Sequence, residues 1–167
     1  MKRKFKNQKG FTIAELLLFM GIFSILTVVL LQLLTSIFDV QLESQSTSSV
    51  SQDGRYILNR LGYDIQKATT IVIPNIGNQD QTLQLASGGI VYTYSLANGN
   101  LTITSSPSGT TDQLNSFNTT VSDINFLRLA DINNKNDTVS FSFTLTSKAI
   151  KRSGAVVENF RTTVGIR

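Results

Sequence analysis

The sequence contains no cysteine and no histidine. These absences exclude thiol catalysis, a Ser-His-Asp triad, and the usual zinc and haem ligands. They also exclude disulfide bonds, so the folded part must be stabilised by its hydrophobic core alone. The sequence has no Gly-rich phosphate-binding loop and no pair of acids at a spacing that suggests acid-base chemistry. We therefore expect no enzymatic activity, no catalytic residue, no metal site and no cofactor.

The formal net charge of +4 and the pI of about 9.5 come from an uneven distribution of basic residues. Five of the fifteen lie before residue 10, namely Lys2, Arg3, Lys4, Lys6 and Lys9. The rest of the chain has ten basic against eleven acidic residues, a side-chain charge of −1. The basic pI is thus no sign of nucleic-acid binding. The basic N-terminus instead favours a membrane topology with this end in the cytoplasm.

An apolar segment of 28 residues runs from Phe11 to Phe38, and its single charged residue is Glu15. About 20 apolar residues are enough to span a bilayer. A charged side chain within such a segment costs about 2.5–3.5 kcal/mol on insertion scales. This cost predicts that Glu15 has a partner.

The stretch Lys9-Gly10-Phe11-Thr12-Ile13-Ala14-Glu15, followed by the apolar segment, resembles the N-terminus of type IV pilin precursors and pilin-like subunits. The resemblance covers about the first 30 residues. It implies that prepilin peptidase cuts after Gly10 and that Phe11 becomes the N-methylated N-terminus. Glu15 then pairs with the N-terminal ammonium of a neighbouring subunit. The implied partners are prepilin peptidase, other pilin or pseudopilin subunits and a membrane protein of the assembly platform.

This resemblance implies a bacterial inner (cytoplasmic) membrane protein that crosses once, with its N-terminus in the cytoplasm, and later enters an extracytoplasmic filament. A secretory signal peptide is a poorer explanation, because it needs an apolar core of roughly 7–15 residues and a small-x-small cleavage site. A plain membrane anchor that keeps its leader and never polymerises remains open. It explains everything except Glu15 and the Gly10–Phe11 junction.

The hydrophobic pattern predicts one long helix from Phe11 to about Ala68, apolar in its first half and amphipathic in its second. Gly21 and Gly54 interrupt it, each at a cost of about 1 kcal/mol relative to alanine. The residues expected to face the core are Val50, Ile57, Leu58, Leu61, Ile65 and Ala68.

Beyond residue 68 the pattern changes to a period of two, which predicts six or seven mostly antiparallel strands. Asn98-Gly99 is a strong signal for a two-residue hairpin turn, and the polar segment 106–116 is expected to be a loop. The fold class is therefore α+β, with the long helix packed on a β-sheet. We expect a leader at 1–10, a membrane and assembly helix at 11–38, its amphipathic continuation at 39–68 and a β-rich extracytoplasmic domain at 69–167.

Two further segments resemble J-type minor pseudopilins and W-type minor pilins. The first is residues 52–68, with Leu61-x-x-Asp64-Ile65-x-x-Ala68, and the second is the closing Phe160-Arg161-Thr162-Thr163-Val164-Gly165-Ile166-Arg167. The apolar segment also lacks the proline of many major pilins and has Gln32 in that region. These features favour a minor, tip-associated subunit. Arg60 and Asp64 are expected to form a solvated i,i+4 ion pair.

Two other segments suggest ligands less clearly. The run from Asp131 to Asp137 is rich in oxygen ligands, but it lacks the glycine and the closing glutamate of a calcium loop. A hairpin loop is the better interpretation. A basic group near the C-terminus leaves open a tip adhesin or a DNA-binding minor pilin, although a charged loop at a sheet edge explains it equally well. This group consists of Lys148, Lys151, Arg152 and Arg161.

Overall fold

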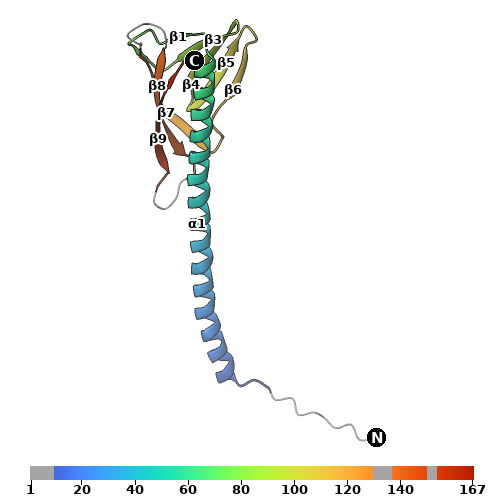
Figure 1. The fold of residues 1–167 in the computed structure, drawn as a ribbon. Coiled ribbons are helices and arrows are strands. Elements are labelled where there is room, and N and C mark those ends of the chain that lie inside the picture. Colours follow the sequence, from blue (N-terminus) through green and yellow to red (C-terminus); the bar gives the residue numbers. More distant parts are fainter. Residues whose placement is uncertain (1–9, 130–136, 150–153) are drawn as a thin grey trace. The chain divides into compact units, whose positions relative to one another are not determined.

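The computed structural model describes residues 10–129, 137–149 and 154–167 (Figure 1). One helix, α1, spans Ile13–Lys67, close to the range 11–68 that the sequence predicts. Nine strands follow in the described residues. The chain forms two compact units, residues 1–41 and 42–167. The α+β fold class is confirmed, and the four-part division into leader, membrane segment, amphipathic segment and β-domain stays a prediction.

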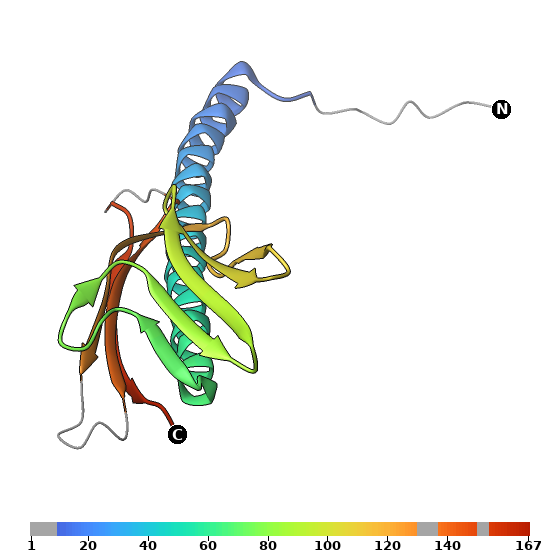
Figure 2. The same cartoon turned by 90° about the horizontal axis from the view of Figure 1, so that it is seen from above.

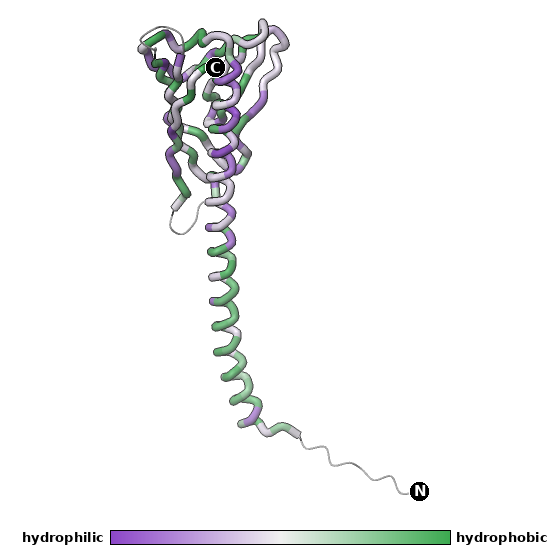
Figure 3. The backbone as a smooth tube through the Cα atoms, viewed as in Figure 1, coloured by the Kyte–Doolittle hydropathy of each residue, from purple (hydrophilic) through white to green (hydrophobic). Residues whose placement is uncertain are grey.

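The N-terminal unit consists of the first part of α1, whose residues are almost all apolar and exposed. Figure 3 shows this part in the hydrophobic colour, whereas the C-terminal part of the helix is mixed. A helix that is apolar on every side needs lipid or other helices around it. The N-terminal unit by itself therefore leaves its apolar surface to be covered from outside.

The first sheet has five antiparallel strands in the order β1-β3-β4-β5-β6. They are β1 (Thr70–Ile73), β3 (Leu83–Ser87), β4 (Ile90–Ala97), β5 (Asn100–Ser106) and β6 (Thr110–Gln113). The β4–β5 hairpin turns at Asn98 and Gly99, which have φ values of 52° and 76°. Positive φ at both turn positions is what an Asn-Gly hairpin requires, so this prediction is confirmed.

The second sheet has four antiparallel strands in the order β2-β7-β8-β9. They are β2 (Gln79–Asp80), β7 (Thr119–Leu129), β8 (Thr138–Ser147) and β9 (Val157–Gly165). The inward side chains of β8 are buried apolar residues, and those between them are serine and threonine. This alternation confirms the period of two that predicted a strand here, although Ser140, which lies between inward residues, is only 7% exposed.

The described residues form nine strands in two sheets, whereas the sequence predicted six or seven strands and one sheet. β2 has two residues, too few to give a pattern of alternation, and β6 lies within the segment 106–116 that was expected to be a loop. β6 is fully exposed and polar, so no apolar periodicity marks it. The expectation of a loop there is therefore wrong, because pairing with β5 rather than burial holds this segment extended.

The C-terminal part of α1 packs on the inner faces of both sheets (Figure 2). The predicted apolar stripe is confirmed, since five of its six residues are at most 3% exposed and Leu58 is partly buried. Gly54 explains why a glycine stands within this helix. A Cβ atom built there would lie 2.1 Å from the ring atom Cζ of Phe160 on β9. That ring stacks on Phe143 of β8 with centroids 5.3 Å apart, so the glycine lets helix and sheet approach closely.

Carboxylates on α1 bind to segments far along the chain. The Asp53 carboxylate accepts hydrogen bonds from the Ser116 amide at 2.9 Å, the Ser116 hydroxyl at 2.7 Å and the Thr119 hydroxyl at 2.5 Å. Three donors on one carboxylate make a strong, charge-assisted contact. This contact fixes the β6–β7 connection against the helix.

Asp64 is more enclosed than the sequence suggests. Arg60 lies 2.8 Å from its carboxylate, as expected, but the Asp64 side chain is only 13% exposed. The Tyr94 hydroxyl on β4 also donates a hydrogen bond to it. The expected ion pair is confirmed and Arg60 is 41% exposed, but the expectation that the pair is solvated is wrong for Asp64, because its carboxylate joins α1 to the first sheet. Burial, together with this hydrogen bond, raises the pKa of Tyr94 well above its ordinary value.

Candidate processing and assembly site

The Gly10–Phe11 junction lies in an irregular segment just before α1. Gly10 is exposed, and the Phe11 side chain is 83% exposed. A peptidase needs an accessible bond in a chain that can extend into its active site, and no backbone hydrogen bond of a helix holds this bond. The structure therefore places the predicted cleavage residues where cleavage is sterically open.

Thr12 directly precedes α1 and caps its N-terminus, a role that was not predicted from the sequence. Its hydroxyl accepts a hydrogen bond from the Glu15 amide at 3.2 Å, and its carbonyl accepts one from the Leu16 amide at 3.1 Å. Thr12-x-x-Glu15 matches the capping-box pattern, and this pattern in the sequence could have identified Thr12 as the N-cap of the helix. Glu15 also lies in the first turn, where a negative charge interacts favourably with the helix dipole. Thus Glu15 has a local role in starting the helix besides the predicted pairing.

The side chains around Glu15 are apolar. A hollow of about 230 Å³ lies beside Glu15 and is lined by Phe11, Glu15, Leu16 and Phe19. Phe19 stacks on Phe23 with ring centroids 6.2 Å apart. Phe11 and Glu15, four residues apart, thus border one apolar hollow. A cation from another chain that entered it would meet one carboxylate in otherwise apolar surroundings.

The N-terminal half of α1 is long and apolar enough to cross a membrane, judged by its length and composition. All of its side chains in the described residues before Gln41 are exposed. Signal sequences near an N-terminus meet the same criterion, so the case for a membrane anchor depends on the motif as well.

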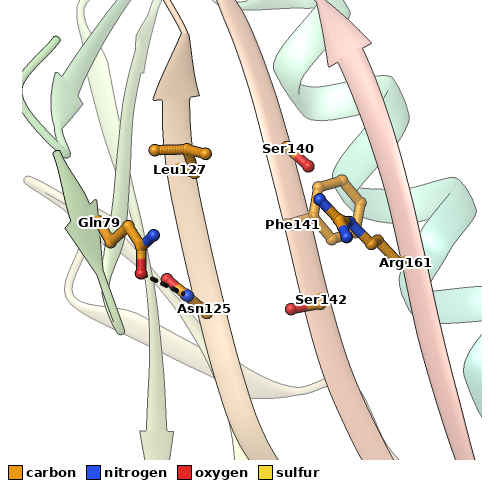
Figure 4. A pocket seen from close by; sticks show the side chains of 7 residues that line it. All are labelled: Gln79, Asn125, Leu127, Ser140, Phe141, Ser142 and Arg161. Carbon is orange, nitrogen blue, oxygen red and sulfur yellow. Dashed lines mark hydrogen bonds between the residues drawn. The ribbon is translucent and has the colours of Figure 1, made fainter. Parts of the chain in front are cut away.

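A second hollow, of about 180 Å³, lies on the outer face of the second sheet (Figure 4). The Gln79 and Asn125 side chains point toward one another there, and the Asn125 amide donates a hydrogen bond of 2.9 Å to Gln79. The remaining lining residues come from β7, β8 and β9 and are Leu127, Ser140, Phe141, Ser142 and Arg161. The lining of this hollow is mostly polar, and all of its residues are far from the N-terminal motif in the sequence.

The basic residues near the C-terminus do not form one patch in the described structure. Arg161 pairs with Ser142 in the middle of the β8–β9 ladder, whereas Lys148 follows the end of β8 six residues later. At about 3.3 Å per residue these positions are roughly 20 Å apart. Lys151 and Arg152 lie outside the described residues, as does the candidate calcium run except for Asp137, which forms an ion pair with Arg128.

The family model described as the prokaryotic N-terminal methylation motif matches residues 5–31, a range that includes Gly10, Phe11 and Glu15. Comparison with curated proteins and with solved structures found no significant match. The family match covers 27 of 167 residues, so it concerns the N-terminal motif and not the β-rich unit.

The motif implies processing by prepilin peptidase and assembly with other pilins, and with the apolar helix it suggests a single-pass inner-membrane anchor. The methylation motif, followed by a long apolar helix and antiparallel sheets, supports a type IV pilin-like protein.

Proposed function

We propose that the protein is a structural subunit of a type IV pilus or of a type II secretion or competence pseudopilus, and that it has no catalytic activity of its own. The observation that carries this proposal is the combination of Glu15 with an apolar helix whose exposed surface needs covering. Prepilin peptidase cuts between Gly10 and Phe11, and Phe11 is then methylated. The segment Phe11–Phe38 contains no lysine, arginine or histidine, so its new α-amino group is the cation that it offers to a carboxylate.

In this account the filament is held together by apolar packing and aligned by one ion pair. A buried carboxylate or ammonium without a partner costs several kcal/mol. The pairing of Glu15 in one subunit with the Phe11 ammonium of its neighbour therefore favours one axial stagger over others. Before assembly the apolar helix lies in the inner membrane, with the basic leader on the cytoplasmic side.

We further propose a minor, tip-associated role. The resemblance of residues 52–68 and 160–167 to J-type and W-type minor subunits supports it. In the structure these segments pack on each other, since Gly54 contacts Phe160 and Gly62 faces Val164. Asp64 of the first segment also binds Tyr94 of the first sheet. The shared pattern thus corresponds to contacts that join the helix to the sheets.

The experiment that tests this function compares Glu15→Gln with Glu43→Gln in cells that assemble the filament. Both changes remove one negative charge from α1, but only the first lies in the apolar segment. We expect Glu15→Gln to be cut and membrane-inserted like the wild type, yet strongly depleted from sheared filaments, while Glu43→Gln is incorporated normally. Equal incorporation of wild type and Glu15→Gln would show that the ion pair does not direct assembly.

A further inference from the structure

Phe117 lies in the loop between β6 and β7, and its side chain is 80% exposed. No other large apolar side chain among the described residues of the unit 42–167 is as exposed. A single exposed apolar residue on a protein surface is ordinary. What distinguishes Phe117 is the structure of the loop that carries it.

The residues on both sides of Phe117 are fixed by hydrogen bonds. Ser116 and Thr119 bind the Asp53 carboxylate on α1, as described above. Asn115 is 3% exposed, and it donates a hydrogen bond to the Thr119 carbonyl at 3.0 Å. The Asn118 carbonyl accepts a hydrogen bond from the Lys148 amide at 2.8 Å. The loop is therefore held from several sides.

This bracing makes Phe117 a pre-organised aromatic side chain. Binding costs free energy when loops and side chains must be ordered, and a loop that is already ordered avoids most of that cost. Rigid aromatic anchors are accordingly enriched among the residues that dominate interfaces. The fold maintains the loop conformation without using the Phe117 ring, which leaves the ring available to a partner.

The loop lies at the end of the unit 42–167 at which α1 enters it. Thr119 pairs with Ser147, and Val157, which is 56% exposed, pairs with Thr146 at this same end of the second sheet. The Ser51 hydroxyl on α1 lies 3.5 Å from the neighbouring Glu158 carboxylate. This end of the unit therefore presents Phe117 and Val157 to whatever packs beside the helix there.

We propose that Phe117 docks on the apolar N-terminal half of α1 from a neighbouring subunit of the filament. Among the described residues, the part of α1 before residue 41 is the one continuous exposed apolar surface that this chain has to offer. A neighbouring subunit with the same N-terminal motif and apolar segment offers a surface of the same kind. A contact between a loop on one subunit and a helix on the next is heterologous, so it is compatible with the open end of a filament instead of closing a dimer.

This inference rests on the proposed function, and its test compares Phe117→Ala, Phe117→Leu and Ile76→Ala in the assembling cells. Ile76 is 47% exposed between β1 and β2 and serves as the control for losing an exposed apolar side chain. We expect Phe117→Ala to be cut normally and to melt like the wild type, but to be incorporated at least tenfold less. Phe117→Leu should recover most of the loss, and Ile76→Ala should show none. Wild-type incorporation of Phe117→Ala would overturn the inference.

The identity of the partner is tested by placing the photo-crosslinker p-benzoyl-phenylalanine at position 117 in the full chain. The expected product joins this position to a peptide from the N-terminal apolar helix of a pilin-like subunit. Products with lipid alone, or with the folded domain of a neighbour alone, would overturn it. The two proposals fail differently: a wild-type chain that is never cut or incorporated contradicts the proposed function, whereas normal assembly with an unaffected Phe117→Ala contradicts only the docking contact.

Discussion

Gly54 and Gly62 lie on the same helix, and the structure predicts opposite effects for alanine at the two positions. Alanine is favoured over glycine in a helix interior by about 1 kcal/mol. At Gly62 a new Cβ would meet only the Val164 methyl Cγ2, at 3.8 Å, which is an ordinary contact. Gly62→Ala should therefore stabilise the protein by up to about 1 kcal/mol.

At Gly54 the same substitution meets the Phe160 ring. The added Cβ would lie 2.1, 2.4 and 2.6 Å from three ring atoms. Because carbon atoms pack at about 3.5 Å or more, the ring must move by about 1.4 Å. Phe143, which is 1% exposed, lies stacked against that ring and restricts the movement. Overpacking of this kind costs about 1–3 kcal/mol, so after the helix-propensity gain of about 1 kcal/mol we expect a net loss of up to about 2 kcal/mol.

The assay is urea unfolding of the full chain in detergent, followed by the near-ultraviolet circular dichroism of the tyrosines and phenylalanines. Phe160→Leu provides the second half of a double-mutant cycle, since it removes the ring atoms that the new Cβ would meet. In that background Gly54→Ala should become neutral or stabilising. The reasoning is refuted if Gly54→Ala stabilises the wild-type chain as much as Gly62→Ala does, or if the Phe160→Leu background leaves its effect unchanged.

Two further predictions concern the carboxylates on α1. Asp53→Ala should lower the free energy of unfolding by about 2–3 kcal/mol, because it leaves the donors of the loop 115–119 without their charged acceptor; an unchanged urea midpoint would contradict this. The pKa of Tyr94 is raised in the folded state, so stability should be full below about pH 10, the ordinary value for tyrosine, and should fall as the pH rises above it. Tyr94→Phe should be less stable at neutral pH and should lose this alkaline component, whereas Tyr63→Phe, with a half-exposed ring, should keep it. An identical alkaline profile for wild type and Tyr94→Phe would argue against the role assigned to the contact with Asp64.

The features that the sequence predicted correctly are those that depend on near neighbours in the chain. The stripe from Val50 to Ala68 repeats at helical spacing, and the alternation in β8 needs only successive residues. The Asn98-Gly99 turn follows from the backbone preferences of two residues. Each of these signals is contained in a short window, so each can be read without knowledge of the fold.

The features that were missed depend on residues far apart in the chain. Asp53 meets Thr119 across 66 positions, and Asp64 meets Tyr94 across 30. Nothing in the local sequence marks Thr119 or Tyr94 as a hydrogen-bond donor to these carboxylates. For this reason the sequence predicted only a solvated ion pair for Asp64. Gly54 was recognised as a cost to the helix, but the Phe160 ring that requires it could be found only in three dimensions. Thr12 is different, because the Thr-x-x-Glu pattern was available in the sequence.

The central claim is that the chain is a prepilin whose N-terminus is made at Phe11. The most direct test is the intact mass and N-terminal sequence of the protein after co-expression with a prepilin peptidase. The account predicts loss of residues 1–10 and one added methyl group on Phe11. An uncut chain that still begins before Gly10 would contradict it and would leave a plain membrane anchor as the explanation of the apolar helix.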